Sequence, residues 1–416
     1  MAEPSIHPPL LRWAAAMAVL ALASLAGCMR APPPVAFHAE GLPETLSAWH
    51  LFKLRGGELA PNDGVLPYEL NTPLFTDYAH KLRTVWMPAG TAAGYRADET
   101  FEFPVGTILS KTFYYPRLAG EPADGARVQR SDDRTGTRPG GRLALAEVRL
   151  VETRLLVRRE AGWVALPYVW NAAQTEARLM RGGSLVRLEL VDATGASEPA
   201  AYAVPDQNQC AGCHASDLRS RVLHPIGPNA RNLNRDLAYR GDDGGEIIRN
   251  QLAHWQQAGL LTGAPEPASA PRLADWRDSA GASLDARARA YLDSNCAHCH
   301  SPRGPGNTSG LWLGSDVVEP LRLGRCKLPI AAGQGTGDRR FGYVPGDPDA
   351  SILSFRIESV DPGVMMPELG RSVVHREGAA LIREWIAAQT GECGTGDEPS
   401  GTDVAENNND QQGRGP

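Results

Sequence analysis

A five-residue pattern that occurs twice constrains this chain more than any other feature. Cys210-Ala211-Gly212-Cys213-His214 and Cys296-Ala297-His298-Cys299-His300 both have the form C-x-x-C-H. Two thiols at this spacing can form thioethers to both vinyl groups of a haem, while the adjacent imidazole reaches the iron. We therefore predict two covalently bound haems c, held by Cys210, Cys213, Cys296 and Cys299, with His214 and His300 as iron ligands.

Two other interpretations of the pattern are a zinc half-site and a thioredoxin-like redox pair. A zinc site needs a second ligand pair at matching spacing, and a redox pair has no use for the fixed following histidine. Haem attachment requires in addition that the chain leaves the cytoplasm.

The N-terminus has the features of a bacterial export signal. Arg12 precedes an apolar run from Trp13 to Ala26, which is too short to span a bilayer comfortably and ends on small residues. Leu25-Ala26-Gly27-Cys28 resembles a lipobox, and by that resemblance Cys28 becomes a lipid-modified N-terminus. We expect a signal peptide at 1–27, a linker at 28–40 and a membrane-anchored periplasmic lipoprotein. The alternative is an ordinary secretory signal with an incidental cysteine.

The remaining cysteines suggest a disulfide. Of seven cysteines, Cys28 is assigned to lipid and four to haem, which leaves Cys326 and Cys393. In an oxidising compartment these two are expected to pair. Two free buried thiols are the alternative.

Composition bounds the remaining questions. The chain has 416 residues, 42% of them hydrophobic, which is enough for two or three domains. The net charge is -6, and no basic cluster alternates with aromatic residues, so we expect no nucleic acid partner. Residues 394–416 are acidic and lack apolar periodicity, which predicts a disordered tail.

Residues 41–204 carry strand patterns and no cysteine. Ser184 to Leu190 alternates apolar with charged residues, and Arg154–Arg158 and Trp163–Leu166 flank a short glycine turn typical of a hairpin. Further strands are predicted around Leu82–Trp86, Phe101–Val105 and Thr107–Tyr115, with a long loop at 120–141. We predict a β-sandwich-like domain whose function its residues do not indicate.

Residues 205–271 are expected to form a first, reduced haem domain of mainly α structure. Pro205 argues against a helix leading into Cys210, and Glu246–Leu261 has the apolar stripe of a helix. Ile226-Gly227-Pro228-Asn229-Ala230 resembles the element of cytochromes c whose proline carbonyl accepts the N–H of the proximal imidazole, so Pro228 is a candidate partner of His214; a plain turn is the alternative.

The sixth ligand of the first haem is open from sequence. No methionine lies between His214 and Met365. His254 is the first candidate and His224 the second, with Met87 and Met180 available from the β domain; a packed or surface histidine is the alternative for His254. A five-coordinate iron would bind small ligands or peroxide.

Residues 283–393, after a linker at 272–282, are expected to form a second, mainly α cytochrome c domain. Ser283 is a candidate N-cap for a helix that leads into Cys296, Asp347-Pro348 is expected to begin a second helix, and Leu381–Ile386 mark a closing helix. Met366, which precedes a proline, is preferred over Met365 as the distal iron ligand. Pro302 and Pro305 are both candidate carbonyl partners of His300, and His298 is expected to face solvent.

The chain as a whole resembles a family of bacterial diheme c-type cytochromes, often lipoproteins, with a β-rich N-terminal region before two C-x-x-C-H segments. The matching stretches are Leu66–Phe75, Leu166–Asn171, both motifs, and Val344–Asp349 through Met366. Genes of this family tend to lie beside one for a secreted parallel β-helix protein, which implies such a partner by association.

We therefore expect a diheme c-type cytochrome that transfers single electrons between redox partner proteins. No set of acidic or nucleophilic residues has catalytic spacing, so no catalytic residue is assigned. The alternatives are a diheme peroxidase, or another oxidoreductase, with an open first haem supplied with electrons by the second, and a β domain that serves as a binding module.

Overall fold

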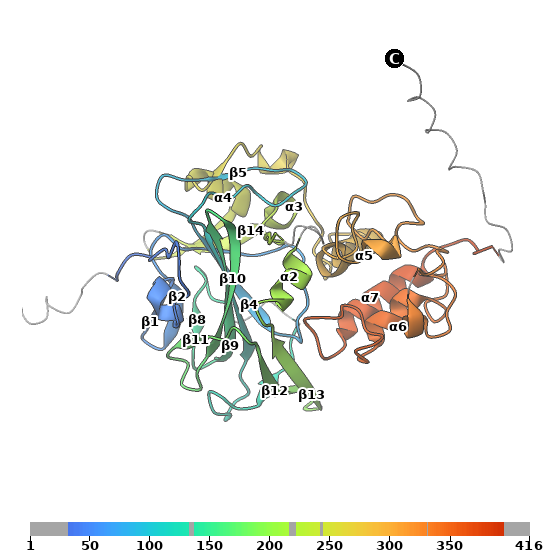
Figure 1. Cartoon of the computed structure of the whole chain (residues 1–416), viewed down its shortest axis with the longest axis horizontal. Coiled ribbons are helices and arrows are strands. Elements are labelled where there is room, and N and C mark those ends of the chain that lie inside the picture. Colours follow the sequence, from blue (N-terminus) through green and yellow to red (C-terminus); the bar gives the residue numbers. More distant parts are fainter. Residues whose placement is uncertain (1–31, 133–136, 216–221, 242–243, 331, 395–416) are drawn as a thin grey trace, which may run out of the picture.

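The computed structural model describes residues 32–132, 137–215, 222–241, 244–330 and 332–394. An antiparallel six-stranded sheet forms the centre of the N-terminal region (Figure 1), in the order β11-β10-β9-β6-β4-β3. Its strands are β3 (Leu66–Tyr68), β4 (His80–Trp86), β6 (Ile108–Pro116), β9 (Val148–Arg159), β10 (Gly162–Trp170) and β11 (Ala177–Leu179).

One face of this sheet packs against a small antiparallel sheet. Leu82, Ile108 and Leu155 share a core with Leu59 and Leu143 of the small sheet. Apolar side chains that alternate along each strand account for this layer, since every second residue points to the same face. The small sheet contains β1 (Phe52–Arg55), β2 (Glu58–Pro61) and β8 (Leu143–Ala144), and a 3-10 turn, η1 (Leu46–Trp49), lies in the same core.

The opposite face is covered by two different layers. Phe113 packs against Leu190 and Tyr202 at one end, and Leu109 packs against Leu252 and Trp255 at the other. The first layer is a sheet of β7 (Arg127–Gln129), β12 (Ser184–Val191) and β13 (Ser197–Val204). The second contains α3 (Ala230–Leu233), α4 (Gln251–Gln257), β16 (Leu261–Thr262) and its parallel partner β5 (Ala93–Gly94).

The predicted architecture, a β-sandwich-like domain followed by two mainly α cytochrome c domains, is wrong. The described residues are 29% strand and 18% helix, and they contain six short helices. The predicted helix at Glu246–Leu261 begins as β15 (Glu246–Asn250), which pairs with β14 (Asp236–Arg240), and becomes α4 only after Asn250. Adjacent β-branched Ile247 and Ile248 favour the strand, and the Asn250 side chain caps α4 by accepting from Leu252 N at 3.0 Å.

The C-terminal region is also less helical than predicted. Its helices are α5 (Leu284–Leu292), α6 (Ile352–Glu358) and α7 (Arg376–Ala387), with a π-helical turn, η3 (Asp293–Ala297), directly after α5. The described part of 301–351 contains no α-helix, because glycines and prolines interrupt it repeatedly. Three 3-10 turns complete the list: η2 (Pro267–Ser269), η4 (Asn307–Ser309) and η5 (Gly333–Thr336).

Several local predictions agree with the structure. The hairpin of β9 and β10 turns between Arg159 and Gly162, and Ser283 caps α5 by accepting from Ala286 N at 3.2 Å. Two others are wrong. Residues 101–105 form no strand, and Ser351, not Asp347, is the residue that precedes α6.

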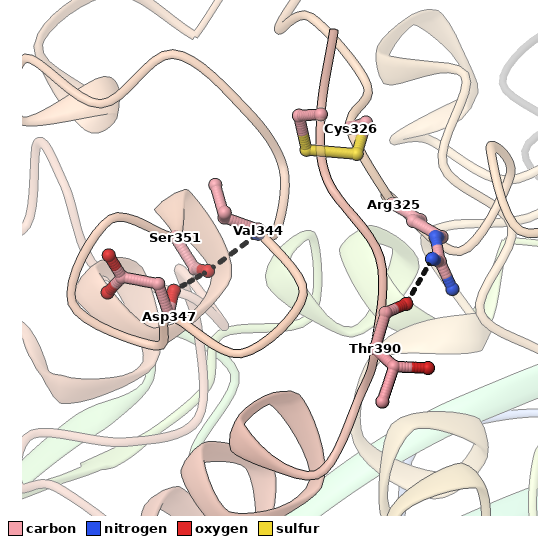
Figure 2. The surroundings of a disulfide bond; sticks show 7 residues. Arg325, Cys326, Val344, Asp347, Ser351 and Thr390 are labelled. Carbon is pink, nitrogen blue, oxygen red and sulfur yellow. Dashed lines mark hydrogen bonds between the residues drawn. A yellow bond between two sulfur atoms is a disulfide. The ribbon is translucent and has the colours of Figure 1, made fainter.

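A disulfide joins Cys326 to Cys393, the pairing that the cysteine count predicted (Figure 2). The neighbouring Arg325 donates to the carbonyl of Thr390, so the segment after α7 is held to the long loop twice. In the turn that precedes α6, the Ser351 hydroxyl donates to Asp347 O at 2.7 Å and accepts from Val344 N at 2.9 Å (Figure 2). The segment that follows α7 is therefore cross-linked to the loop that contains Cys326.

Candidate functional site

Each C-x-x-C-H motif lies on a helical turn that places its three reactive side chains on one face. The first is the whole of α2 (Gln209–His214), and the second begins in η3. In the second, the backbone N–H of His300 donates to Cys296 O at 2.8 Å, as in an α-helix. Residues at i, i+3 and i+4 of a helix are neighbours, so both thiols and the imidazole of each motif face the same side.

Both motif histidines have one ring nitrogen engaged. His214 Nδ1 lies 2.8 Å from the carbonyl of His224, and His300 Nδ1 lies 3.0 Å from the hydroxyl of Ser309. A partner at Nδ1 fixes the ring and leaves Nε2 for a metal. The predicted proline partners are not used: Pro228 O accepts instead from Phe101 N, and Ser309 takes the place expected for Pro302 or Pro305.

The two motifs touch each other. The Cys299 thiol lies 3.9 Å from the carbonyl of Gly212. The neighbouring Cys299 and His298 side chains lower the pKa of Cys213, whereas burial raises the pKa of Cys296 to about 12. Figure 1 shows that α2, which carries the first motif, lies between the large sheet and the C-terminal helices, and this position brings the two motifs together. Both motifs therefore belong to one site.

Two cavities adjoin this site. The larger, of about 1250 Å³, is lined by both His214 and His300. The smaller, of about 150 Å³, is lined by His214, Cys210, Cys213, Cys296 and Met366. Cofactor pockets are commonly about 300–1000 Å³ in volume, so the larger cavity, which both imidazoles line, has room for a bulky group.

Burial keeps both imidazoles neutral at pH 7. Burial lowers the pKa of His214 to about 4, and the charges of Lys111 and Arg154 act in the same direction. Burial likewise lowers the pKa of His300 to about 4, assisted by Arg356 and His298. A neutral imidazole is the form that binds a metal, so both histidines are ready to act as ligands.

Three cationic side chains form a row across the sheet beside His214. Arg83 of β4 pairs in register with Lys111 of β6, and Lys111 pairs with Arg154 of β9. All three line the larger cavity with His214. Burial and the two arginines lower the pKa of Lys111 to about 7. Arg83 also pairs with Glu69 at 3.5 Å, and Arg154 pairs with Glu152 at 2.5 Å. Like charges opposite one another on adjacent strands destabilise a sheet, so Lys111, at the centre of this row, which we call the cationic row, is the member best suited to meet an anion.

Met366 lies in a loop held by an arginine. Arg371 donates from Nη2 to the carbonyls of Met366 (2.9 Å), Arg356 (3.2 Å) and Ser359 (2.8 Å) and is itself 8% exposed. Met366 lines the smaller cavity and Met365 lines neither. His300 lines only the larger one, so the structure brings Met366 into one cavity with Cys296 and His214 but not with His300.

The other predicted ligands lie elsewhere. The ring of His254 contacts that of Tyr239 in a tilted arrangement, with 3.9 Å between centroids, and neither His254 nor His224 lines the two cavities. Met87 is buried in the core beside α4, and Met180 is 37% exposed.

Cys28 falls outside the described residues, as does nearly all of the predicted disordered tail. None of the described helices is long and apolar enough to cross a membrane.

The four motif thiols do not converge as a zinc site. Within the described parts of the chain, the one group of three or more side chains whose ligand atoms lie within 4.8 Å of one another is Asp132, His375 and Glu377. That group contains no cysteine. The alternative of a zinc site built from the four motif cysteines therefore finds no support in the geometry.

Comparison with known proteins gives no further information. No protein-family model, no curated protein and no solved structure matches the chain. The function must therefore be inferred from the site itself.

Proposed function

We propose that this protein is an extracytoplasmic diheme c-type cytochrome, tethered to a membrane through Cys28, which transfers single electrons between redox partner proteins. The observation that carries the proposal is the pair of C-x-x-C-H turns whose imidazoles line one cavity of about 1250 Å³. The proposal concerns covalently attached haem, and it does not require the cytochrome c fold that the helix content contradicts.

The residues of the site fit this cofactor. The cysteine pairs would hold the vinyl groups, and His214 and His300, both neutral and fixed at Nδ1, would bind the irons. Haem supplies one-electron redox chemistry when it is bound. The protein contributes the cationic row of Arg83, Lys111 and Arg154, which would offset the negative charge of propionates.

Met366 is the distal ligand we propose for one of the irons. Its loop is fixed by Arg371, and its side chain lines a cavity with Cys296. A thioether is a neutral, soft ligand that favours ferrous iron and raises the potential. Such a ligand suits a protein that relays electrons.

One observation favours a second function, peroxide reduction at the first haem. His254, the predicted sixth ligand, packs against Tyr239 and lines neither cavity, so no histidine of α4 is positioned to occupy the site opposite His214. An iron without a strong sixth ligand can bind and activate peroxide.

One set of measurements on the purified mature protein tests both functions. Mass spectrometry should show two haems and acyl chains on Cys28, and oxidised and reduced spectra should be those of low-spin c-type haem. A mass without haem contradicts the proposal. High-spin ferric bands together with turnover of hydrogen peroxide would instead establish the peroxidase.

A further inference from the structure

A second site lies away from the C-x-x-C-H motifs, where the N-terminal region meets α7. Asp132 follows β7, His375 directly precedes α7, and Glu377 is in the first turn of that helix. His375 Nε2 lies 3.6 Å from Asp132 Oδ1 and 3.9 Å from Glu377 Oε2. The ligand atoms of the three side chains all lie within 4.8 Å of one another.

The imidazole of His375 is fixed with Nε2 directed at these carboxylates. Its other nitrogen, Nδ1, lies 3.0 Å from the Tyr291 hydroxyl, and Phe75 stacks on the ring at 4.1 Å. The residue is 4% exposed, and Nε2 is buried with no hydrogen-bond partner. A buried polar atom without a partner is costly, so the site has an unmet requirement for a ligand.

Both carboxylates are held in place by other groups. Arg277 donates to Asp132 Oδ1 at 2.6 Å and to Oδ2 at 3.0 Å, and the Tyr78 hydroxyl donates to Glu377 Oε2 at 2.6 Å. Each carboxylate oxygen has a second lone pair, so these contacts orient the acids without using up their capacity to bind. Outer partners of this kind are usual around metal ligands.

We propose that Asp132, His375 and Glu377 bind a zinc ion. Ligand atoms about 2.0–2.2 Å from a tetrahedral zinc are separated by about 3.4 Å, close to the 3.6 Å and 3.9 Å found here. An octahedral ion at the same bond lengths would bring neighbouring ligands to about 3.0 Å. Calcium and magnesium take oxygen ligands, so the imidazole excludes them.

The surroundings suit the remaining coordination position. Asp132 and His375 line a small cavity of about 70 Å³, which has room for a water molecule as fourth ligand. The two carboxylates would balance the charge of the ion. Bound zinc would join the loop after β7 to the start of α7 and so fix the C-terminal region against the large sheet.

Isothermal titration of the chelator-treated mature protein with zinc chloride tests the site. The wild type should bind one zinc, and Glu377→Gln and Asp132→Asn should weaken binding at least tenfold. Glu384→Gln is the matched control, because Glu384 is an exposed acid of the same helix and lacks a place in the triad. Zinc should also raise the melting temperature of the wild type and of the control, but not of Glu377→Gln.

Two outcomes would overturn the proposal. The first is the absence of saturable zinc binding. The second is equal zinc affinity in Glu377→Gln and Glu384→Gln, which would place the zinc elsewhere, for instance on motif thiols that carry no haem. Circular dichroism of each variant checks that a lost response does not reflect unfolding.

Discussion

The Cys299 thiol lies 3.9 Å from the main-chain carbonyl of Gly212, so two residues 87 positions apart, one from each motif, are in direct contact. Groups attached to these two motifs would share a low-dielectric interior. A charge added to the group on one motif would therefore shift the redox potential of the group on the other, because buried charges are screened far less than exposed ones.

The first prediction concerns this coupling. In a potentiometric titration of the wild type, the two haem potentials should be further apart than those of the single-haem variants Cys210→Ser/Cys213→Ser and Cys296→Ser/Cys299→Ser. A coupling that changes an equilibrium tenfold appears as about 60 mV for one electron. If the wild-type curve equals the sum of the two variant curves, the contact carries no coupling.

The second prediction separates two adjacent methionines. Met366 lines the smaller cavity, whereas Met365 lines neither cavity and is 8% exposed. Replacing Met366 with Ala should abolish the weak near-infrared Met–haem band and lower one potential, because a thioether ligand raises it. Met365→Leu is the matched control and should keep the band. Persistence of the band in Met366→Ala would mean that another side chain is the ligand.

Local features of the fold, such as helix caps and hairpin turns, could be predicted from sequence better than the pairing and packing of its elements. The Ser283 cap of α5 and the hairpin of β9 and β10 were accessible because neighbouring residues determine them. The helix predicted at Glu246–Leu261 failed in its first half, because pairing with β14 decides the conformation of Glu246–Asn250. Tertiary contacts overrode a weak local periodicity there.

In the candidate site, too, features set by neighbouring residues could be predicted and features set by tertiary structure could not. The thiols and imidazoles were identified from their spacing, but their Nδ1 partners, His224 and Ser309, were not, because loop geometry decides which oxygen reaches the ring. The cationic row was missed as well, since strand register joins its members. A signal existed: Lys111 is the one charged residue of the mostly buried strand β6, and a charge at such a position suggests a functional role.

The third prediction concerns the disulfide. Cys326 and Cys393 close a loop of 67 residues, and in the chain-entropy model a crosslink of that length stabilises the folded state by about 4 kcal/mol. The double variant Cys326→Ala/Cys393→Ala should therefore lose roughly that free energy of unfolding in a urea titration. A loss below about 1 kcal/mol would show that the unfolded C-terminal region is already compact.

The fourth prediction is a pH dependence caused by Lys111. Burial and the neighbouring arginines lower its pKa to about 7, against 10.5 for a free lysine. Between these values the unfolded chain binds one more proton than the folded chain, so the stability of the haem-free protein should rise with pH. One proton corresponds to about 1.4 kcal/mol per pH unit. Below pH 7 both states are protonated, and the slope due to Lys111 should vanish.

Lys111→Met tests this assignment, since methionine has a similar length and no charge. Urea titrations at several pH values should show that the variant is more stable than the wild type at pH 7 and that the difference narrows toward pH 10. Lys53, a partly exposed lysine that pairs with the exposed Asp63, gives the control Lys53→Met, for which no such trend is expected. Attached haem should reverse the effect: propionates facing Arg83, Lys111 and Arg154 would stabilise the ammonium, so that in the haem-loaded protein Lys111→Met becomes destabilising. Equal effects with and without haem would mean that the cationic row does not meet the cofactor.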